Sequence, residues 1–92
     1  MKKYLLYMHH GKLMTTEVVF IDGRCYKAAD PSKWHSKVAG RPLVLSMGKV
    51  WCYESDLQKA KKIVIDNYRR YARETKERAL KIIETENDLM EG

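Results

Sequence analysis

Short runs of apolar, aromatic and β-branched residues fill the first half of the chain, and turn-forming residues separate them. This pattern is typical of β-strands. Asp22-Gly23 stands between two such runs, and an Asp-Gly pair in this position is a strong signal for a tight β-hairpin. The expected strands cover residues 3–9, 13–21, 24–28, 43–47 and 49–53, where the last two are one or two strands around Gly48. Residues 30–42 lose the pattern and are expected to form an ordered loop.

Helical spacing of apolar residues replaces this pattern in the second half of the chain. Ser55-Asp56-Leu57-Gln58 has the form of a capping box, and neither Gly nor Pro follows before the last residue. The apolar positions are Leu57, Ala60, Val64, Tyr68, Tyr71, Ala79, Ile82, Ile83 and Leu89. About 35 helical residues make a rod of roughly 50 Å, which is about twice the width expected of the preceding β-unit. The helix therefore either bends near Thr75 and folds back, or packs its distal half against another subunit.

Together these elements predict an α+β fold in one domain, residues 1–92. An antiparallel sheet of four to five strands, a β-meander over residues 1–54, precedes one long C-terminal helix over residues 55–91. The helix is expected to pack on one face of the sheet. The core expected between them consists of Tyr4, Leu6, Val19, Ile21, Val50, Val64 and Tyr68.

Composition agrees with a folded domain, because 45% of the residues are hydrophobic and 33% are charged. No apolar run approaches the roughly 18 residues of a membrane span. Met1-Lys2-Lys3 and the apolar residues after it resemble a signal peptide, but the apolar stretch is short and His9-His10 replace a cleavage site. We therefore expect a cytoplasmic protein in which Cys25 and Cys52 are reduced thiols.

Catalytic and metal-binding chemistry finds little support in the residue spacing. His9 and His10 point to opposite faces of a strand, and the two cysteines form no Cys-x-x-Cys pair. A chain of 92 residues also offers little room for an enzyme pocket between domains. The sequence therefore predicts a protein that is not an enzyme and that holds no metal or cofactor.

The net charge of +6 is unevenly distributed along the chain. Residues 59–81 carry nine Lys and Arg against three Asp and Glu, whereas residues 82–92 carry four acidic residues and no basic one. A basic protein of this kind is expected to meet anionic partners. The basic helix and the acidic tail are separate surfaces.

Two groups of cations are candidates for binding a partner or a nucleic acid. In the loop, Lys33, Trp34, His35, Lys37 and Arg41 place an aromatic ring among positive charges, which suits a base and its phosphates. The alternative is that Trp34 folds back over the sheet and the lysines keep the loop soluble. In the helix, Arg69, Arg70 and Arg73 suit phosphate oxygens, and the alternative is a solvated face with ion pairs at four-residue spacing.

The acidic end of the helix predicts self-association. Four carboxylates occupy the C-terminal turns, where the helix dipole disfavours negative charge. A second copy that runs antiparallel would place the basic segment 59–78 beside them and cover the apolar residues. The residues expected to form this homodimer contact are Ala79, Ile82, Ile83, Leu89 and Met90.

A familiar arrangement begins at Gly48-Lys49-Val50-Trp51 and continues through Glu54-Ser55-Asp56 into an Ala-Lys-containing helix. Over about residues 1–70 it resembles small uncharacterised proteins of bacteriophages and prophages, mostly of Gram-positive hosts. Those proteins join a β-meander and a basic aromatic loop to a "G-x-V-W-x-x-E-x-D" strand and a long charged helix. This chain has Ser55 where a basic residue is expected. The resemblance implies a phage or mobile-element accessory protein that binds a host or defence component.

The expected function is therefore that of a small basic binding protein, which self-associates and inhibits or modulates a host protein or nucleoprotein in the host cytoplasm. Direct nucleic-acid binding through the basic loop and the arginine-rich helix face is the alternative. A third possibility is the binding of a small anionic nucleotide at a subunit interface.

Overall fold

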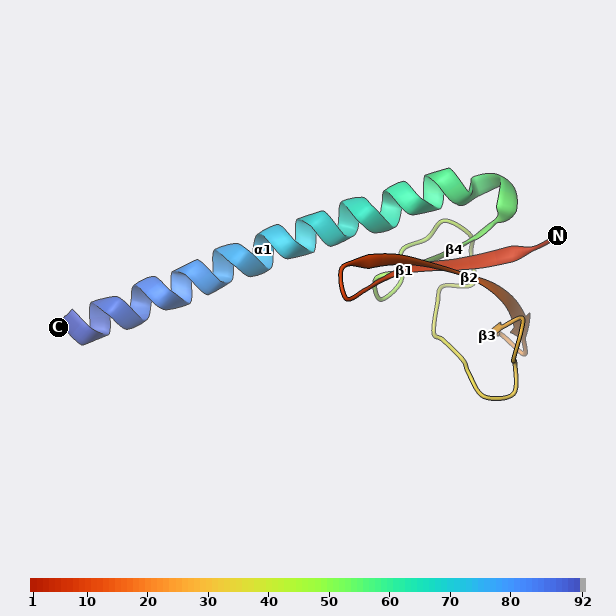
Figure 1. Cartoon of the computed structure of the whole chain (residues 1–92), viewed down its shortest axis with the longest axis horizontal. Coiled ribbons are helices and arrows are strands. Elements are labelled where there is room, and N and C mark those ends of the chain that lie inside the picture. The colour runs from red at the N-terminus through yellow and green to blue at the C-terminus, as the bar shows by residue number, and fades with distance from the viewer. Residues whose placement is uncertain (92) are drawn as a thin grey trace.

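A four-stranded antiparallel sheet and one long helix make up the fold in the computed structural model, which describes the backbone of residues 1–91 and the side chains of residues 1–76 (Figure 1). The strands lie in the order β3-β2-β1-β4. The elements are β1 (Lys3–His9), β2 (Lys12–Ile21), β3 (Arg24–Lys27), β4 (Lys49–Tyr53), a 3₁₀ turn (Glu54–Asp56) and α1 (Leu57–Glu91). The α+β fold predicted from the sequence is confirmed.

Three two-residue turns connect or precede the strands, and each has two residues in the left-handed region. The φ values are 50° and 76° at His10-Gly11, 51° and 76° at Asp22-Gly23, and 54° and 79° at Met47-Gly48. Two positive φ angles in succession define a type I′ turn, whose twist matches that of paired strands. Glycine at the second position carries no Cβ penalty there, so the three X-Gly pairs determine where the chain reverses.

Residues 43–47 do not form the fifth strand that the sequence allowed. Leu43 has a φ of 62° and Met47 a φ of 54°, so the backbone leaves the extended conformation at both ends of this run. Within this run, Ser46 forms two backbone hydrogen bonds of 2.9 Å with Lys49 that close the Met47-Gly48 turn, and Leu43 donates a single one to Trp51. The sheet therefore has four strands.

One face of the sheet packs against α1. The buried residues of this contact are Leu6, Val50, Cys52, Ala60 and Val64. Alternate residues of β1 and β4 point to this face, while Ala60 and Val64 lie one helical turn apart on α1. Because the strand residues alternate and the helix residues are four positions apart, this half of the core could be predicted from the sequence.

The opposite face is covered by the long segment between β3 and β4, which forms a second core of Leu5, Val18, Cys25 and Trp51. The segment reaches both edges of the sheet. The backbone N–H of Ser36 donates to the carbonyl oxygen of Cys25 in β3 at 2.8 Å, and that of Leu43 donates to Trp51 in β4 at 2.9 Å. Both edge strands are therefore partly covered, which reduces their capacity to pair with other chains.

Three members of the expected core are more exposed than predicted. Val19 and Ile21 are 37% and 48% exposed, and Tyr68 is 38% exposed. Lys3, the first residue of β1, pairs with Val18, so Val19 and Ile21 belong to the part of β2 that extends past β1 and pairs only with β3. Because α1 packs on β1 and β4, it does not cover them.

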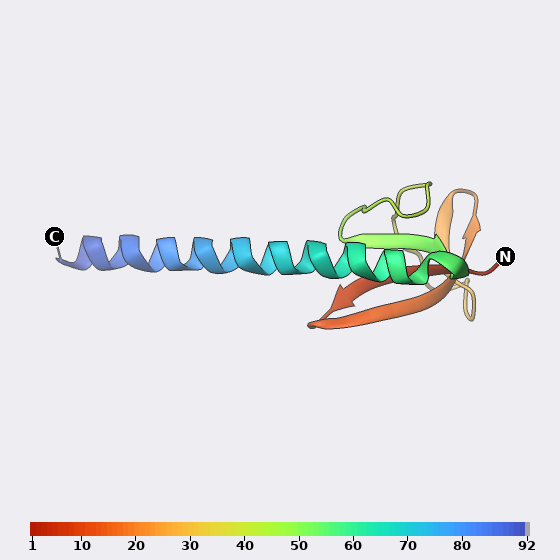
Figure 2. The same ribbon diagram turned by 90° about the horizontal axis from the view of Figure 1, so that it is seen from above.

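The helix is continuous through Thr75, so the fold-back expected as one alternative is wrong. It starts beside the far end of β4 and runs back over the sheet (Figures 1 and 2). About 15 residues suffice to cross a sheet of this width, and the remaining 20 or so extend for roughly 30 Å beyond it. The molecule measures 62 × 27 × 20 Å as a result. At its start, Ser55 lies inside the 3₁₀ turn, so Asp56 rather than the predicted Ser55 immediately precedes α1.

Candidate functional site

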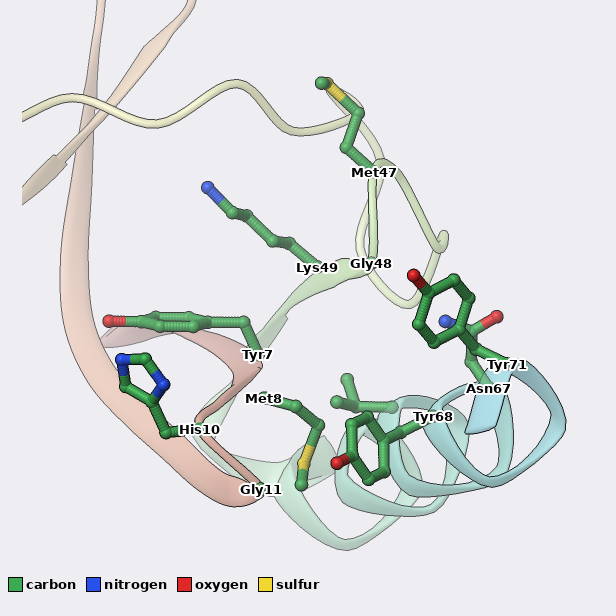
Figure 3. Close-up of a pocket in the computed structure, with 11 residues that line it drawn as sticks. Tyr7, Met8, His10, Gly11, Met47, Gly48, Lys49, Asn67, Tyr68 and Tyr71 are labelled. Carbon is green, nitrogen blue, oxygen red and sulfur yellow. The ribbon is translucent and has the colours of Figure 1, made fainter. Parts of the chain in front are cut away.

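A cleft opens at the end of the sheet where α1 leaves it. Two of the type I′ turns, His10-Gly11 and Met47-Gly48, lie at this end, because β4 runs antiparallel to β1 and Lys49 pairs with Tyr7. The cleft has a volume of about 450 Å³ between these turns and the helix (Figure 3). Its lining residues are Tyr7, Met8, His10, Gly11, Met47, Gly48, Lys49, Val64, Asn67, Tyr68 and Tyr71.

Aromatic and thioether side chains form most of the cleft wall. In Figure 3, Tyr7 and His10 stand on one side, Tyr71 stands opposite them, and Tyr68 lies beside Met8. Met47 is 79% exposed and Tyr71 is 64% exposed, although both are large apolar side chains. Such exposure beside a concave surface is a feature of binding sites, since the cleft leaves apolar area to be covered.

The helical side of the cleft is held in place by packing against the sheet. Tyr68 and Tyr71 project from a helix whose preceding turns are anchored by buried Ala60 and Val64. The hydroxyl oxygen of Tyr68 lies 3.8 Å from the position that a Cβ would take at Gly11, so the helix and the first turn are in close contact. The cleft is therefore formed before any partner arrives, which lowers the entropic cost of binding.

One cation, Lys49, belongs to the cleft, and two contacts of its Nζ hold it in place. Its Nζ donates a hydrogen bond of 2.6 Å to the hydroxyl oxygen of Ser36, and it lies 5.8 Å from the centre of the Tyr7 ring. Ser36 is buried, so this contact also fixes the covering loop. The lining contains no Asp or Glu. The electrostatic character of the cleft is therefore mildly positive.

The predicted binding loop is present, but its aromatic residue faces inward. Lys33, His35, Lys37 and Arg41 are exposed. Trp34 is half-buried, packs on the second core, and has the Nζ of Lys27 5.7 Å from its ring centre. The expectation of partial exposure is met, yet the ring serves to hold the loop on the sheet as the alternative interpretation proposed.

The arginine cluster lies on the other side of the molecule. Arg69, Arg70 and Arg73 are exposed. At 100° per residue they lie between about 120° and 180° around the helix axis from Val64, which faces the sheet. The loop covers the opposite face of the sheet from α1, so the helix and the sheet separate the two basic groups (Figure 1). They do not form one continuous surface.

The predicted self-association residues, Ala79, Ile82, Ile83, Leu89 and Met90, have side chains outside the described ones, and only their place on α1 is established.

The two cysteines are buried thiols in different cores. Burial raises the pKa of the Cys25 thiol, against which the positive charge of Lys49 acts. Burial likewise raises the pKa of the Cys52 thiol, and the carboxylate of Asp56 adds to the increase. Both are therefore protonated at neutral pH and poor nucleophiles. Within the described part of the chain, no three His, Cys, Asp or Glu side chains come together as a metal site.

Sequence reasoning missed the cleft because its residues come from three separate elements. Two signals could have found it. His10-Gly11 and Met47-Gly48 are X-Gly pairs at the same end of adjacent antiparallel strands, and Tyr68 and Tyr71 continue the apolar stripe of α1 just where the helix outruns the sheet. Together these signals place exposed aromatic side chains beside two tight turns.

No protein-family model, curated protein or solved structure matches this chain. Among the residues that the structure describes, no helix is both long enough and apolar enough to cross a membrane.

Proposed function

We propose that this protein is a non-enzymatic protein-binding protein, and that the cleft formed by the two turns and α1 is its binding surface. The observation that carries the proposal is the exposure of Met47 and Tyr71 at the edge of a preformed apolar cleft. The partner would insert an apolar side chain into the cleft.

The chemistry of the cleft suits a polypeptide partner. Tyrosine and methionine are enriched at protein interfaces, because tyrosine offers a large contact area with few rotatable bonds and methionine adapts its shape. Three tyrosines and two methionines line the cleft. Tyr68 and Tyr71 also present hydroxyl groups, which are able to bond to a partner backbone while the rings contact its side chains.

The sequence resemblance supplies the biological setting of the proposal. In that setting the protein is an accessory protein of a phage or mobile element, and its partner is a host protein or nucleoprotein in the host cytoplasm. Binding would inhibit or modulate the partner by covering one of its own apolar surfaces.

Direct nucleic-acid binding gains no comparable support. The basic loop and the arginine cluster face away from each other, and Trp34 packs inward on the second core. Nucleic acid would then have to contact one basic group at a time, which limits the number of phosphates neutralised. Direct binding of this kind would weaken steeply with salt, whereas an apolar protein contact would not.

Affinity capture with matched variants tests the proposal. The full chain, a Met47→Ser/Tyr71→Ser variant and an Ile21→Ser control would each be tagged and incubated with bacterial host lysate, with and without nuclease. Ile21 is a suitable control because it is 48% exposed and is the last residue of β2, at the end of that strand opposite to the His10-Gly11 turn of the cleft. Captured proteins would be quantified by mass spectrometry, and the strongest would be purified and titrated.

At least one protein should be captured equally by the full chain and the control. The double variant should lose it by about tenfold or more, because removing an aromatic anchor from an interface costs about 2 kcal/mol. Equal capture by all three chains would contradict the proposal. Loss of every captured protein on nuclease treatment would favour nucleic acid instead.

A further inference from the structure

The distal part of α1 is too far from the cleft of its own chain to occupy it. Tyr71 lines the cleft, and Leu89 lies 18 residues further along α1. Because α1 is continuous, those residues correspond to roughly 27 Å along the axis. The helix end can therefore reach a cleft of this kind only in a second copy of the chain.

We propose that the cleft receives the C-terminal end of α1 from a second copy, in an antiparallel pair in which each chain fills the cleft of the other. This inference rests on the proposed function, because it names a partner for the same cleft. The inserted residues would be Leu89 and Met90, flanked by Glu86, Asp88 and Glu91.

The lengths of the helix and the sheet allow this arrangement. The 20 residues after Tyr71 extend beyond the sheet in each copy. If two such extensions lie antiparallel with Leu89 beside Tyr71, the two-fold axis passes near residue 80, and about 30 Å of helix is shared. Figure 1 shows that the sheet lies on one side of α1. If the helix of the second copy lies along that same side of the extension, it is level with the sheet. Its C-terminal end then meets the cleft at the edge of the sheet.

The apolar sequence pattern continues along the same line. Tyr68, Ile82 and Leu89 fall on one seven-residue spacing, and the polar Thr75 occupies its remaining position. Seven residues are about two turns, so positions with this spacing remain near one side of a helix. Tyr68 lines the cleft. The side of α1 that carries Tyr68 at the cleft is therefore the side on which the sequence places Ile82 and Leu89.

Charge decides between the antiparallel and the parallel pair. Residues 59–81 have nine basic and three acidic residues, and residues 82–92 have four acidic residues only. An antiparallel pair places the acidic end of each copy against the basic segment of the other, whereas a parallel pair places the two acidic ends together. The cleft itself contributes Lys49 and no carboxylate.

Individual ion pairs contribute little to this contact. Arg69 and Arg73 lie on the side of α1 away from the cleft, so they do not form close ion pairs with a helix that lies on the cleft side. Lys76 is at the same level along the axis as Glu84 of the second copy in this register, while Glu74 is level with Glu86. The net attraction comes from the segments rather than from a set of specific ion pairs.

Mixed disulfide formation between two variants that each carry one added cysteine tests the pairing. A tagged Tyr71→Cys chain and an untagged Leu89→Cys chain would be mixed and oxidised, and the products separated on a non-reducing gel. Cys25 and Cys52 are buried and do not compete. The mixed 71–89 product should exceed either homodimer by about fivefold, since a disulfide requires Cα atoms within about 7 Å.

Other products would overturn the pairing. A predominance of 71–71 or 89–89 homodimers would indicate a parallel or different contact. Absence of any crosslink would also overturn the proposed pairing. Light scattering of the full chain, measured alongside, would then show how it fails. A monomer would mean that the chains do not pair, and a dimer would mean that they pair through another surface. A mass near twice 10.8 kDa together with the 71–89 product supports the proposed pairing.

The two proposals fail in different ways. If the 71–89 product forms but the lysate experiment yields no protein that depends on Met47 and Tyr71, binding of a foreign partner is wrong and the pairing stands. If such a protein is captured but the 71–89 product is absent, the pairing is wrong and the cleft remains a binding surface.

Discussion

The indole Nε1 of Trp51 donates a hydrogen bond of 2.7 Å to the carbonyl oxygen of Ala39. Trp51 is a buried residue of β4, and Ala39 belongs to the long segment that covers the sheet. The bond therefore joins the covering loop to the centre of the second core. The same loop supplies Ser36, which holds Lys49 at the cleft.

Replacing Trp51 by Phe should destabilise the protein by about 1–3 kcal/mol, because it removes the indole donor and reduces apolar volume in the second core. Urea denaturation followed by circular dichroism would measure the change. Tyr53→Phe is the matched control, since Tyr53 is half-buried and packs its ring against Trp51 at 5.4 Å between centroids. An equal effect of the two substitutions would show that the Ala39 bond has no role.

Val64→Ala should destabilise the protein by about 1–3 kcal/mol through lost apolar burial and a residual cavity. Val64 is 1% exposed between α1 and the sheet, whereas Val44, in the loop, is 41% exposed. Val44→Ala should therefore change the free energy of unfolding by less than about 0.5 kcal/mol. A change below half a kilocalorie at Val64 in a urea titration would contradict the packing of α1.

Trp34→Ala should lower the melting temperature rather than leave it unchanged. The ring packs on the second core, so its removal should cost about 2 kcal/mol, or roughly 10 °C for a domain of this size. Lys33 is the exposed neighbour of Trp34, so Lys33→Ala should change the melting temperature little. An unchanged melting temperature of the Trp34 variant would contradict its packing on the second core and would favour a role in binding a partner.

Alkaline pH should weaken the folded state through the two buried thiols. Burial raises the pKa of Cys25 and Cys52, so the unfolded chain loses these protons first as the pH rises. Stability should be insensitive to the thiols below about pH 8 and should fall above about pH 8.5. A Cys25→Ala/Cys52→Ala variant should be less stable at neutral pH but lose less stability from there to pH 9.5 or so. Urea titrations at several pH values would measure the free energy of unfolding of both proteins. An equal decrease with rising pH for the original chain and the variant would refute the role of the thiols.

Elements defined by local pattern were the ones that the sequence predicted well. The spacing of Ala60 and Val64 and the Asp22-Gly23 turn depend on neighbours in the chain, and both were placed correctly. The second core was not predicted, because Leu5 and Trp51 alternate with residues of the first core and their cover comes from an irregular loop. The cleft was missed for a related reason: it joins Tyr7, Met47 and Tyr71 from three elements, and only tertiary packing brings them together.

Residues 43–47, in the long segment between β3 and β4, were expected to form a strand for the same reason: only their local pattern was visible. Positive φ angles at Leu43 and Met47 end a run whose composition is typical of a strand. Local preference for extended structure is overridden there, because the backbone of Leu43 bonds to Trp51 and the Met47-Gly48 turn must reverse the chain into β4. Neither requirement is visible in the residues of the run alone.

Photocrosslinking at the cleft tests the central claim most directly. A photoreactive phenylalanine analogue would replace Tyr71 in the full chain, and Ile21 in a matched control, and each protein would be irradiated in host lysate. We expect the Tyr71 position to yield discrete adducts with the apolar segment of a polypeptide, identified by mass spectrometry, and the Ile21 position to yield none of them. Identical adducts from both positions, or nucleic-acid adducts alone at Tyr71, would contradict the assignment of the cleft as the protein-binding surface.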